Sequence, residues 1–318
     1  MSVSDLKHTI PPGFDTPTAL PRTAEEEKAW QEANRAWWEN HPMRYDFSTR
    51  VRAKEFSEEF YREIDARFFS DVRTFMPWKS IPFDPLLDFQ SLGDKDVLEI
   101  GVGNGSHAQL ISPFTRSYTG IDLTDYAVTS TTRRLQLRGG KPSTKIIRMD
   151  AEKLSFVDNS FDFIWTWGVI HHSANTRRIL EEMHRVLRPG GQAITMVYHR
   201  SFWNYYIFAG VFGGLLRGKL PKPGLVHSAR QQLIDGALAR YYTRSEWRQL
   251  VSDLFTVADT RIYGSKSELL PLPSGRVKNV LRACIPDVSS RFVTNRCRAG
   301  MFLVTTLRKT GTSAHQSL

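Results

Sequence analysis

The sequence predicts an α/β protein in which helices cover both faces of a mostly parallel sheet. Apolar, strand-like runs alternate with helical patterns through the middle of the chain, as is typical of parallel strands joined by crossover helices. Glycine and proline mark the connections, as in "VLRPGG" (186–191), where Pro189 cannot continue a helix. The expected strands are 95–100, 117–121, 145–149, 161–167 and 192–198, and the expected helices between them are 105–113, 125–138 and 176–187.

Two helices are expected before this sheet. Residues 24–40 carry acids in the first turn and tryptophans at helical spacing, and the His-Pro pair that follows ends the pattern. Residues 52–75 repeat a phenylalanine or isoleucine every four positions. We interpret 24–90 as a helical lid and the Pro/Thr-rich residues 1–23 as a flexible lead.

The second half of the chain completes the main domain, which we expect to span 91–310 before a flexible tail at 311–318. Its further elements are a helix at about 244–254 and strands at 255–263 and 301–309. The segment at about 199–242 is much longer than an ordinary connection, so we interpret it as a cap inserted after the fifth strand.

Composition excludes several classes of protein. No window approaches the roughly 18 uninterrupted apolar residues that a membrane span needs, and the N-terminus lacks the basic start and apolar core of a signal peptide. The two cysteines, Cys284 and Cys297, are too few for a disulfide framework or a four-ligand metal site. We therefore expect a cytoplasmic protein without a metal.

The net charge of +10 is unevenly distributed along the chain. From Arg217 to the end there are 17 Lys/Arg against 6 Asp/Glu. Such asymmetry is compatible with nucleic acid or an anionic membrane as a partner, or simply with an arginine-rich solvated face. The basic residues are scattered rather than clustered, so nucleic acid is not the expected partner.

The run "VLEIGVGNGSH" (97–107) carries the most specific signal. A dinucleotide turn of the form G-x-G-x-x-G needs glycine at 106, where Ser106 stands, and the carboxylate of Glu99 would repel a pyrophosphate. The same carboxylate suits a cationic ligand such as S-adenosylmethionine. Asp122 follows the second strand and Asp150 the third, where they could accept from ribose hydroxyls and from an adenine amino group. Parallel strands gather ligands at their carboxyl ends, so three successive acids predict a site for a cationic nucleoside.

From about residue 96 to 200 the chain resembles the class I S-adenosylmethionine-dependent methyltransferases of the small-molecule type. The matching stretches, in family order, are "VLEIGVGNG", "GIDLT", "MDAEKLSF", "FDFIWTWGVIHH" and "VLRPGG". The resemblance implies a Rossmann-like, seven-stranded sheet with a reversed last strand and S-adenosylmethionine as cofactor. It also implies that the cofactor is bound by Glu99, Gly101, Gly103, Gly105, Asp122, Leu123, Asp150 and Ala151.

His171 and His172, in the loop after the fourth strand, are the candidate general bases, since histidine exchanges a proton near neutral pH. The alternative is that His172 orients the loop by bonding to backbone while His171 packs inward. Adjacent histidines rarely face one ion, so no metal is expected here. The stretch 37–47, "WWENHPMRYDF", could close over the site, with Arg44 or Tyr45 touching the methionine carboxylate of the cofactor; its tryptophans could equally only pack the lid.

The most apolar stretch is 201–223, which ends in basic residues. It could line a pocket for an apolar acceptor, pack as a buried cap, or make peripheral contact with a membrane. Six aromatic or histidine side chains are plausible polar groups of the acceptor pocket, or ordinary packing under the cap: Tyr198, His199, Tyr205, Tyr206, Tyr241 and Tyr242.

The expected function is methyl transfer to a small or medium organic acceptor, such as a natural-product, sugar or lipid-like intermediate, with oxygen favoured over nitrogen or carbon. One alternative is an RNA methyltransferase that uses the basic C-terminal third; the Asn/Asp-Pro-Pro-Tyr/Phe signature of amino-group methylases is absent after the fourth strand. A second alternative is a scaffold that binds the cofactor without turnover.

Overall fold

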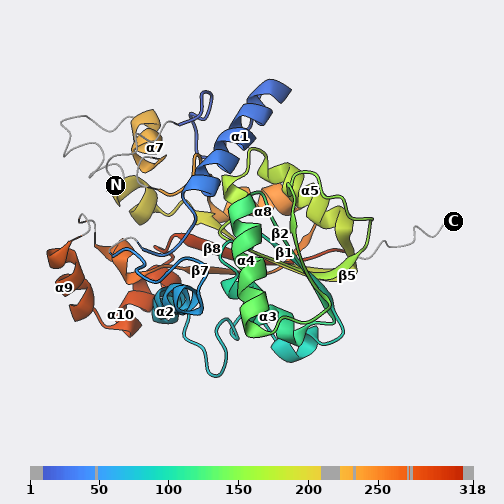
Figure 1. Cartoon of the computed structure of the whole chain (residues 1–318). Coiled ribbons are helices and arrows are strands. Elements are labelled where there is room, and N and C mark those ends of the chain that lie inside the picture. Colours follow the sequence, from blue (N-terminus) through green and yellow to red (C-terminus); the bar gives the residue numbers. More distant parts are fainter. Residues whose placement is uncertain are drawn as a thin grey trace.

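The protein is built around one mixed sheet, which the computed structural model shows within its described residues, 10–46, 49–208, 223–231, 234–270, 272 and 275–310 (Figure 1). The strand order is β3-β2-β1-β4-β5-β8-β7, and only β8 runs antiparallel to its neighbours. The bounds are β1 Asp96–Ile100, β2 Ser117–Asp122, β3 Thr144–Arg148, β4 Phe161–Trp167, β5 Leu187–His199, β7 Thr256–Tyr263 and β8 Phe302–Arg308. A short strand, β6 (Tyr241–Tyr242), pairs in parallel with the end of β5. The expected α/β sheet with a reversed last strand is confirmed, and β6 is an addition to it.

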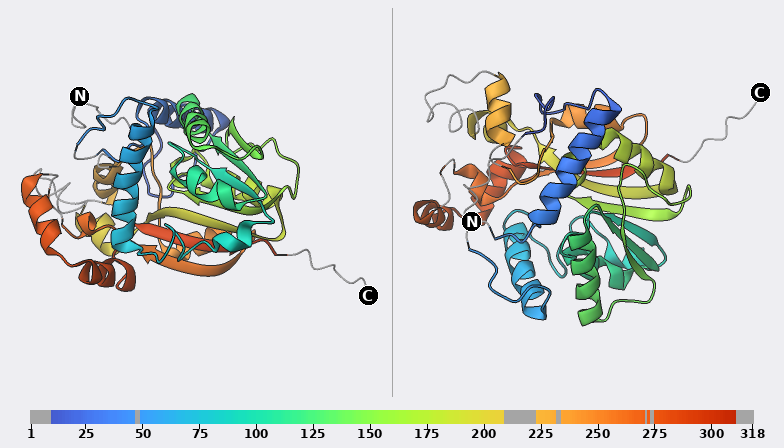
Figure 2. Two further views of the ribbon diagram at one scale, coloured as in Figure 1. Left: turned by 60° about the horizontal axis from the view of Figure 1, so that its bottom comes forward. Right: turned by 45° about the horizontal axis from the view of Figure 1, so that its top comes forward.

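Helices cover both faces of this sheet (Figures 1 and 2). Those that follow the strands are α3 Ser106–Ile111, α4 Asp125–Arg138, α5 Thr176–Val186 and α8 Arg244–Val251. Their ends show ordinary capping: the Thr124 hydroxyl accepts from the Ala127 N–H at the start of α4, and Gly139 ends that helix in the left-handed conformation. The expected helices at 125–138 and 176–187 therefore lie where their patterns placed them, to within one residue.

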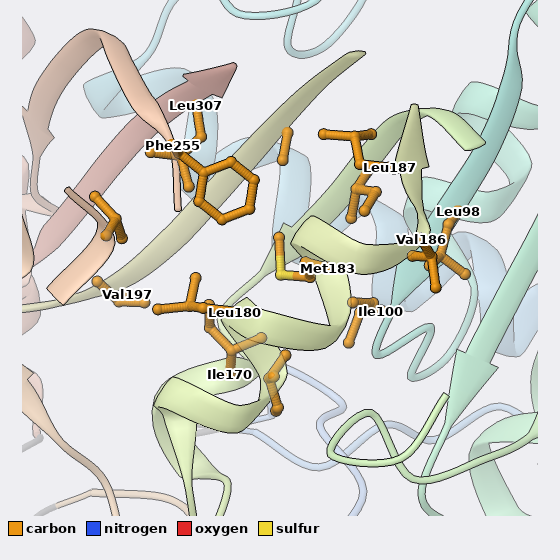
Figure 3. Packing of buried hydrophobic residues seen from close by; sticks show 14 of the residues in the cluster. Leu98, Ile100, Ile170, Leu180, Met183, Val186, Leu187, Val197, Phe255 and Leu307 are labelled. Carbon is orange, nitrogen blue, oxygen red and sulfur yellow. The ribbon is translucent and has the colours of Figure 1, made fainter. Parts of the chain in front are cut away.

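Two apolar clusters hold the layers together. On one face α5 packs through Leu180 and Met183, as Figure 3 shows, and α8 joins the same cluster through Trp247. On the other face α3 and the N-terminal helix α2 (Glu58–Phe75) pack against the sheet. Helix α2 begins at Glu58, later than the expected residue 52, because Phe56 has a positive φ of 62° and Ser57 caps the helix.

Helix α1 (Ala24–Asn40) is the first element of the expected lid, and the chain before it is not a loose lead where the structure describes it. Phe14 is buried against Trp30, whose indole N–H donates to Pro12 O over 2.9 Å. The N–H of Tyr241 donates to Pro17 O, which ties this lead to the end of the sheet. The expectation of flexibility is therefore wrong for residues 10–23, because Phe14 supplies an apolar anchor; residues 1–9 and the tail at 311–318 lie outside the described residues.

Two insertions follow β5 and β7. The expected cap at about 199–242 holds a π-helical segment, η5 (Phe202–Phe208), the helix α7 (Pro223–Gln231) and strand β6, while residues 209–222 lie outside the described residues. The second insertion, residues 264–301, was not anticipated from the sequence. It contains η7 Lys266–Leu269, α9 Arg276–Cys284, α10 Asp287–Arg291 and η8 Phe292–Arg296. None of the helices in the described ranges is long and apolar enough to cross a membrane.

Candidate functional site

The glycine turn after β1 opens toward a large cavity of about 1320 Å³. Gly101, Gly103 and Gly105 all have positive φ angles, of 84°, 53° and 77°. A Cβ at Gly101 would lie 2.2 Å from Cγ2 of Val169, whereas a Cβ at Gly103 would meet nothing within 4 Å. Gly101 thus lets the turn pack against the loop after β4, and Gly103 leaves its cavity side open for a ligand. Gly105 caps α3 against Thr131 and does not line the cavity.

Asp122 stands at the end of β2, with its carboxylate facing the same turn. Its Oδ2 accepts from the Gly103 N–H over 3.1 Å, and its Oδ1 accepts from the Thr124 N–H and hydroxyl over 3.1 and 2.8 Å. Burial raises the pKa of this carboxyl. Leu123 beside it also lines the cavity. The turn and the acid are therefore fixed to each other before any ligand binds.

Asp150, after β3, joins the sheet to the lid. Its Oδ1 accepts from the Glu152 N–H and from the Gln31 side-chain amide of α1, both over 2.9 Å. The same amide of Gln31 accepts from the Ala174 N–H over 3.1 Å. Asp150 and Ala151 line the cavity, so Gln31 holds α1 beside the cavity, against the end of β3 and the loop after β4.

Glu99 lies beneath the turn instead of on the cavity wall. It is 1% exposed and accepts from the hydroxyl of Tyr118 through Oε2. Its Oε1 has no hydrogen-bond partner among the described residues, and Nδ1 of His107 lies 3.7 Å from it. Burial raises the pKa of Glu99 well above its usual value, and the same burial lowers the pKa of His107 to about 3. Glu99 does not line the cavity, so the role that the sequence predicts for it beside the cofactor is indirect in this geometry.

Trp38, Pro42 and Met43 of the predicted lid stretch line one side of the cavity, and of Arg44 and Tyr45 only Tyr45 does so. Tyr45 lines the cavity and stacks on Phe68 of α2, with ring centroids 4.7 Å apart. Arg44 does not line the cavity, because its guanidinium pairs with Glu55 and bonds to the Tyr126 hydroxyl. Arg44 therefore fastens the lid instead of reaching the cofactor site.

The two histidines occupy different positions. Nδ1 of His172 lies 2.8 Å from Leu238 O, and the ring lines the cavity. A carbonyl can only accept, so Nδ1 carries a proton; when the ring is neutral, Nε2 is therefore its acceptor atom. His171 is fully buried against Tyr198 and His172, neither of its ring nitrogens has a hydrogen-bond partner among the described residues, and burial lowers its pKa well below the usual value. His171 packs inward and is not placed to exchange a proton with a ligand.

Of the six further polar groups considered for the acceptor pocket, only Tyr198 lines the cavity. His199 bonds to Gly300 O over 2.9 Å, and Tyr206 is 45% exposed. The other three are buried in packing: Tyr205 contacts His227, Tyr241 accepts from Arg230, and Tyr242 lies against Trp247. Any Tyr near the sheet end fits the sequence pattern, so sequence could not choose among them.

The far half of the cavity is built from residues that sequence analysis did not select. Asp71 of α2 accepts from Ser265 over 3.0 Å, and Glu268 of η7 accepts from the Ser265 and Met301 N–H groups. Burial raises the pKa of Glu268 to about 8, and that of Asp235, in the cap, to about 6. Glu268 and Asp235 lie far from the glycine turn in sequence, in insertions without a motif, and Asp71 is one acid among several on α2, so no local pattern indicates any of the three.

Comparison with known proteins agrees with this geometry. Residues 98–195 match the family described as "Methyltransferase domain". The chain contains a class I S-adenosylmethionine-dependent methyltransferase domain. The matched part begins inside β1 and ends inside β5, so it contains the glycine turn, Asp122, Asp150 and the loop with His172.

Two curated relatives share this methyltransferase domain. A phthiotriol/phenolphthiotriol dimycocerosates methyltransferase of Mycobacterium tuberculosis is 39% identical over 102 residues, which cover 31% of this chain and 36% of the relative. A sterol 24-C-methyltransferase of Neurospora crassa is 33% identical over 99 residues, covering 31% of this chain and 26% of the relative. The chain thus matches about a third of the length of these relatives.

A solved structure shares the fold beyond that core. It is described as the complex between the Haloferax volcanii Trm112 methyltransferase activator and a methyltransferase; the match covers 80% of this chain and 96% of that chain, with 15% identity and a TM-score of 0.51. At this identity the likeness concerns the fold alone.

The residues of the methyltransferase domain fit S-adenosylmethionine, the cofactor of this class. The turn is open at Gly103, where a Cβ would meet nothing within 4 Å, and the cavity-lining carboxylate of Asp122 offers acceptors for hydroxyl groups. Among the residues that the structure describes, no group of three His, Cys, Asp or Glu could hold a metal ion.

Proposed function

We propose that the chain is an S-adenosylmethionine-dependent methyltransferase that acts on a lipid-like acceptor, on oxygen. The observation that carries this is the size and position of the cavity. It runs from the glycine turn past α2 to the second insertion, and its volume of about 1320 Å³ exceeds the roughly 300–1,000 Å³ typical of pockets for drug-sized ligands. It therefore has room for the cofactor and a bulky organic acceptor together. The two relatives named for a phthiotriol lipid and a sterol support an acceptor of this class.

In this proposal the sheet ends hold the donor and the insertions hold the acceptor. Gly101 to Gly103, Asp122 and Asp150 bind S-adenosylmethionine, which supplies an activated methyl group. The apolar side chains Phe75, Met196 and Met301, all on the cavity wall, contact the hydrocarbon part of the acceptor. Alignment of the acceptor oxygen with the methyl group is the main contribution of such a site.

His172 is the proposed general base. Its Nδ1–H bond to Leu238 O fixes the tautomer in which Nε2 accepts, and a neutral histidine can take the proton of an acceptor hydroxyl. Asp235, whose pKa is raised to about 6, is a second base on the same cavity wall. His171 has no part in this step.

The test is transfer of a labelled methyl group. The purified chain is incubated with S-adenosylmethionine labelled in its methyl group and with a total lipid extract, and, separately, with total RNA. With the cofactor below its dissociation constant, the proposal expects label in the organic phase with the wild type and at least about tenfold less with Asp122→Asn. Label in RNA with none in lipid would favour the RNA methyltransferase; bound cofactor without label in either would favour the scaffold.

A further inference from the structure

Helix α9 presents its apolar side chains to solvent instead of to the protein. None of its residues is buried. Val277, Val280 and Leu281 are 69%, 63% and 42% exposed, and they recur at the i, i+3, i+4 spacing that marks one face of a helix. A helix on the surface of a soluble domain ordinarily turns this face inward.

The opposite face of α9 forms part of the cavity wall. Lys278, Asn279, Arg282 and Ala283 line the cavity, two of them basic. The helix thus separates the cavity from the surroundings, with its polar side inward and its apolar side outward. Its outer face therefore lies directly beside the proposed acceptor half of the site.

The apolar face continues along the insertion. Val288 and Phe292, in α10 and η8, are 70% and 61% exposed. This part is firmly attached to α2, because Arg291 donates to Thr74 O over 3.1 Å and Asn295 to Phe75 O over 2.8 Å. Figures 1 and 2 show α9 and α10 together at the outer edge of the molecule. The two hydrogen bonds to α2 hold α10 and η8, with their outward side chains, in this place.

A third group of exposed apolar residues is tied to the same insertion. Phe202 and Tyr206 of η5 are strongly exposed, and the neighbouring Trp203 donates its indole N–H to Glu268 O over 3.2 Å. We call the exposed residues of α9, α10, η8 and η5 the apolar edge: Phe202, Trp203, Tyr206, Val277, Val280, Leu281, Val288, Phe292 and Val293.

The charge around the apolar edge is strongly positive. Residues 264–301 contain seven Lys/Arg and only two acids, Glu268 and Asp287. Lys278 and Arg282 line the cavity, whereas Arg276, Arg296 and Arg298 are exposed on the outside of the insertion. Glu268 is buried, and Asp287 is paired with Lys266. Exposed apolar side chains among basic residues are the combination that binds an interface of anionic lipids, where acyl chains take the apolar groups and headgroups the charges.

We propose that the apolar edge docks on the surface of an anionic lipid bilayer. The bilayer would then cover the outer face of α9, whose inner face lines the cavity, so a lipid could pass into the acceptor half without crossing water. Peripheral membrane contact was one of three sequence-based interpretations of 201–223; of that segment only 201–208 is described, and its exposed residues form one part of the apolar edge. Docking requires no methyl transfer, so it goes beyond the proposed function.

The test is co-sedimentation with vesicles without cofactor. Vesicles of phosphatidylcholine and phosphatidylglycerol in equal amounts are compared with vesicles of phosphatidylcholine alone. The edge variant is Val280→Asp/Leu281→Asp/Phe292→Asp, and the matched control, Phe114→Asp/Leu137→Asp/Val157→Asp, changes three residues that are also exposed but lie elsewhere. None of the six lines the cavity, so calorimetry with S-adenosylmethionine should give wild-type affinity for both and thereby show that they fold.

The proposal expects the wild type and the control to bind the anionic vesicles, and the edge variant to bind them at least tenfold more weakly. It also expects each protein to bind vesicles of phosphatidylcholine alone more weakly than the anionic vesicles. Absence of wild-type binding, or equal binding by the edge variant, would overturn it. A wild-type dimer that the edge variant converts to a monomer, without vesicle binding, would also overturn it and assign the edge to a second copy of the chain. If the wild type binds the vesicles but transfers no methyl group to lipid, the proposed function is rejected and the membrane docking stands.

Discussion

Single residues at this site combine a structural and a chemical task. His172 is fixed by one bond to Leu238 O and so keeps one tautomer, whereas its neighbour His171 is sealed in the interior. Both rings are buried and adjacent in sequence, but only His172 lines the cavity and has a backbone partner. Asp235 is the contrasting case, a cavity-lining acid whose pKa is raised to about 6, first by burial and then by the charge of Asp46. Such a group costs stability when it is ionised.

Replacement of Asp235 by Asn should therefore stabilise the protein at neutral pH. The folded pKa of about 6 lies above the unfolded value of 3.8, so the folded state binds more protons between these values, and stability falls as pH rises through this window. Asn cannot ionise and so avoids this loss. The free energy of unfolding of Asp235→Asn should therefore exceed that of the wild type by about 1–3 kcal/mol at pH 7.5 and should equal it below about pH 4. Urea unfolding at both pH values measures it; an equal effect at pH 4 and pH 7.5 would contradict the assignment.

At the scale of elements, the lid is connected to the sheet ends by side chains of α1. Gln31 joins Asp150 to Ala174, and both carboxylate oxygens of Glu39 accept from the first N–H groups of α4. The sequence predicted α1 because amphipathic spacing and capping are local. It could not predict these bonds, because Gln31 meets a residue 119 positions away.

Gln31→Ala should weaken the binding of S-adenosylmethionine. The change removes one bond to Asp150 and one to the loop after β4, and a typical hydrogen bond contributes about 0.5–1.5 kcal/mol, so the dissociation constant should rise about 2- to 12-fold. Glu32→Ala, at the next and exposed position of α1, is the matched control and should bind normally. Calorimetric titration with S-adenosylmethionine measures this change. An unchanged dissociation constant in Gln31→Ala would mean that α1 does not order the cofactor site.

The same division between local and distant information explains what the sequence could and could not predict. The strands and the glycine turn follow from short patterns, and parallel pairing then brings Asp122 and Asp150 to one edge of the sheet. The insertion at 264–301 escaped prediction because α9 buries no residue and so lacks an ordinary core pattern. Arg44 was misjudged because its partners, Glu55 and Tyr126, come from two other segments.

At the scale of the whole molecule, the basic C-terminal third is not one surface. Arg240 is fully buried and donates to the carbonyls of Ala19, Ser173 and Ala174, while Arg230 bonds to Tyr241 inside the cap. These charges stabilise the interior, and others surround the apolar edge. The distribution favours a lipid-like acceptor over RNA, which would need a continuous basic surface.

Whether the carboxyl edge of the sheet binds S-adenosylmethionine can be measured by calorimetric titration of the wild type and two variants. Asp122→Asn removes a carboxylate that lines the cavity, and Asp125→Asn removes one three residues away that is 63% exposed and paired with Arg148. Hydrogen bonds to a charged group contribute about 1.5–3 kcal/mol. We therefore expect Asp122→Asn to bind S-adenosylmethionine at least about tenfold more weakly than the wild type, and Asp125→Asn to bind it with wild-type affinity. Wild-type affinity in both variants, or no binding by the wild type, would contradict it.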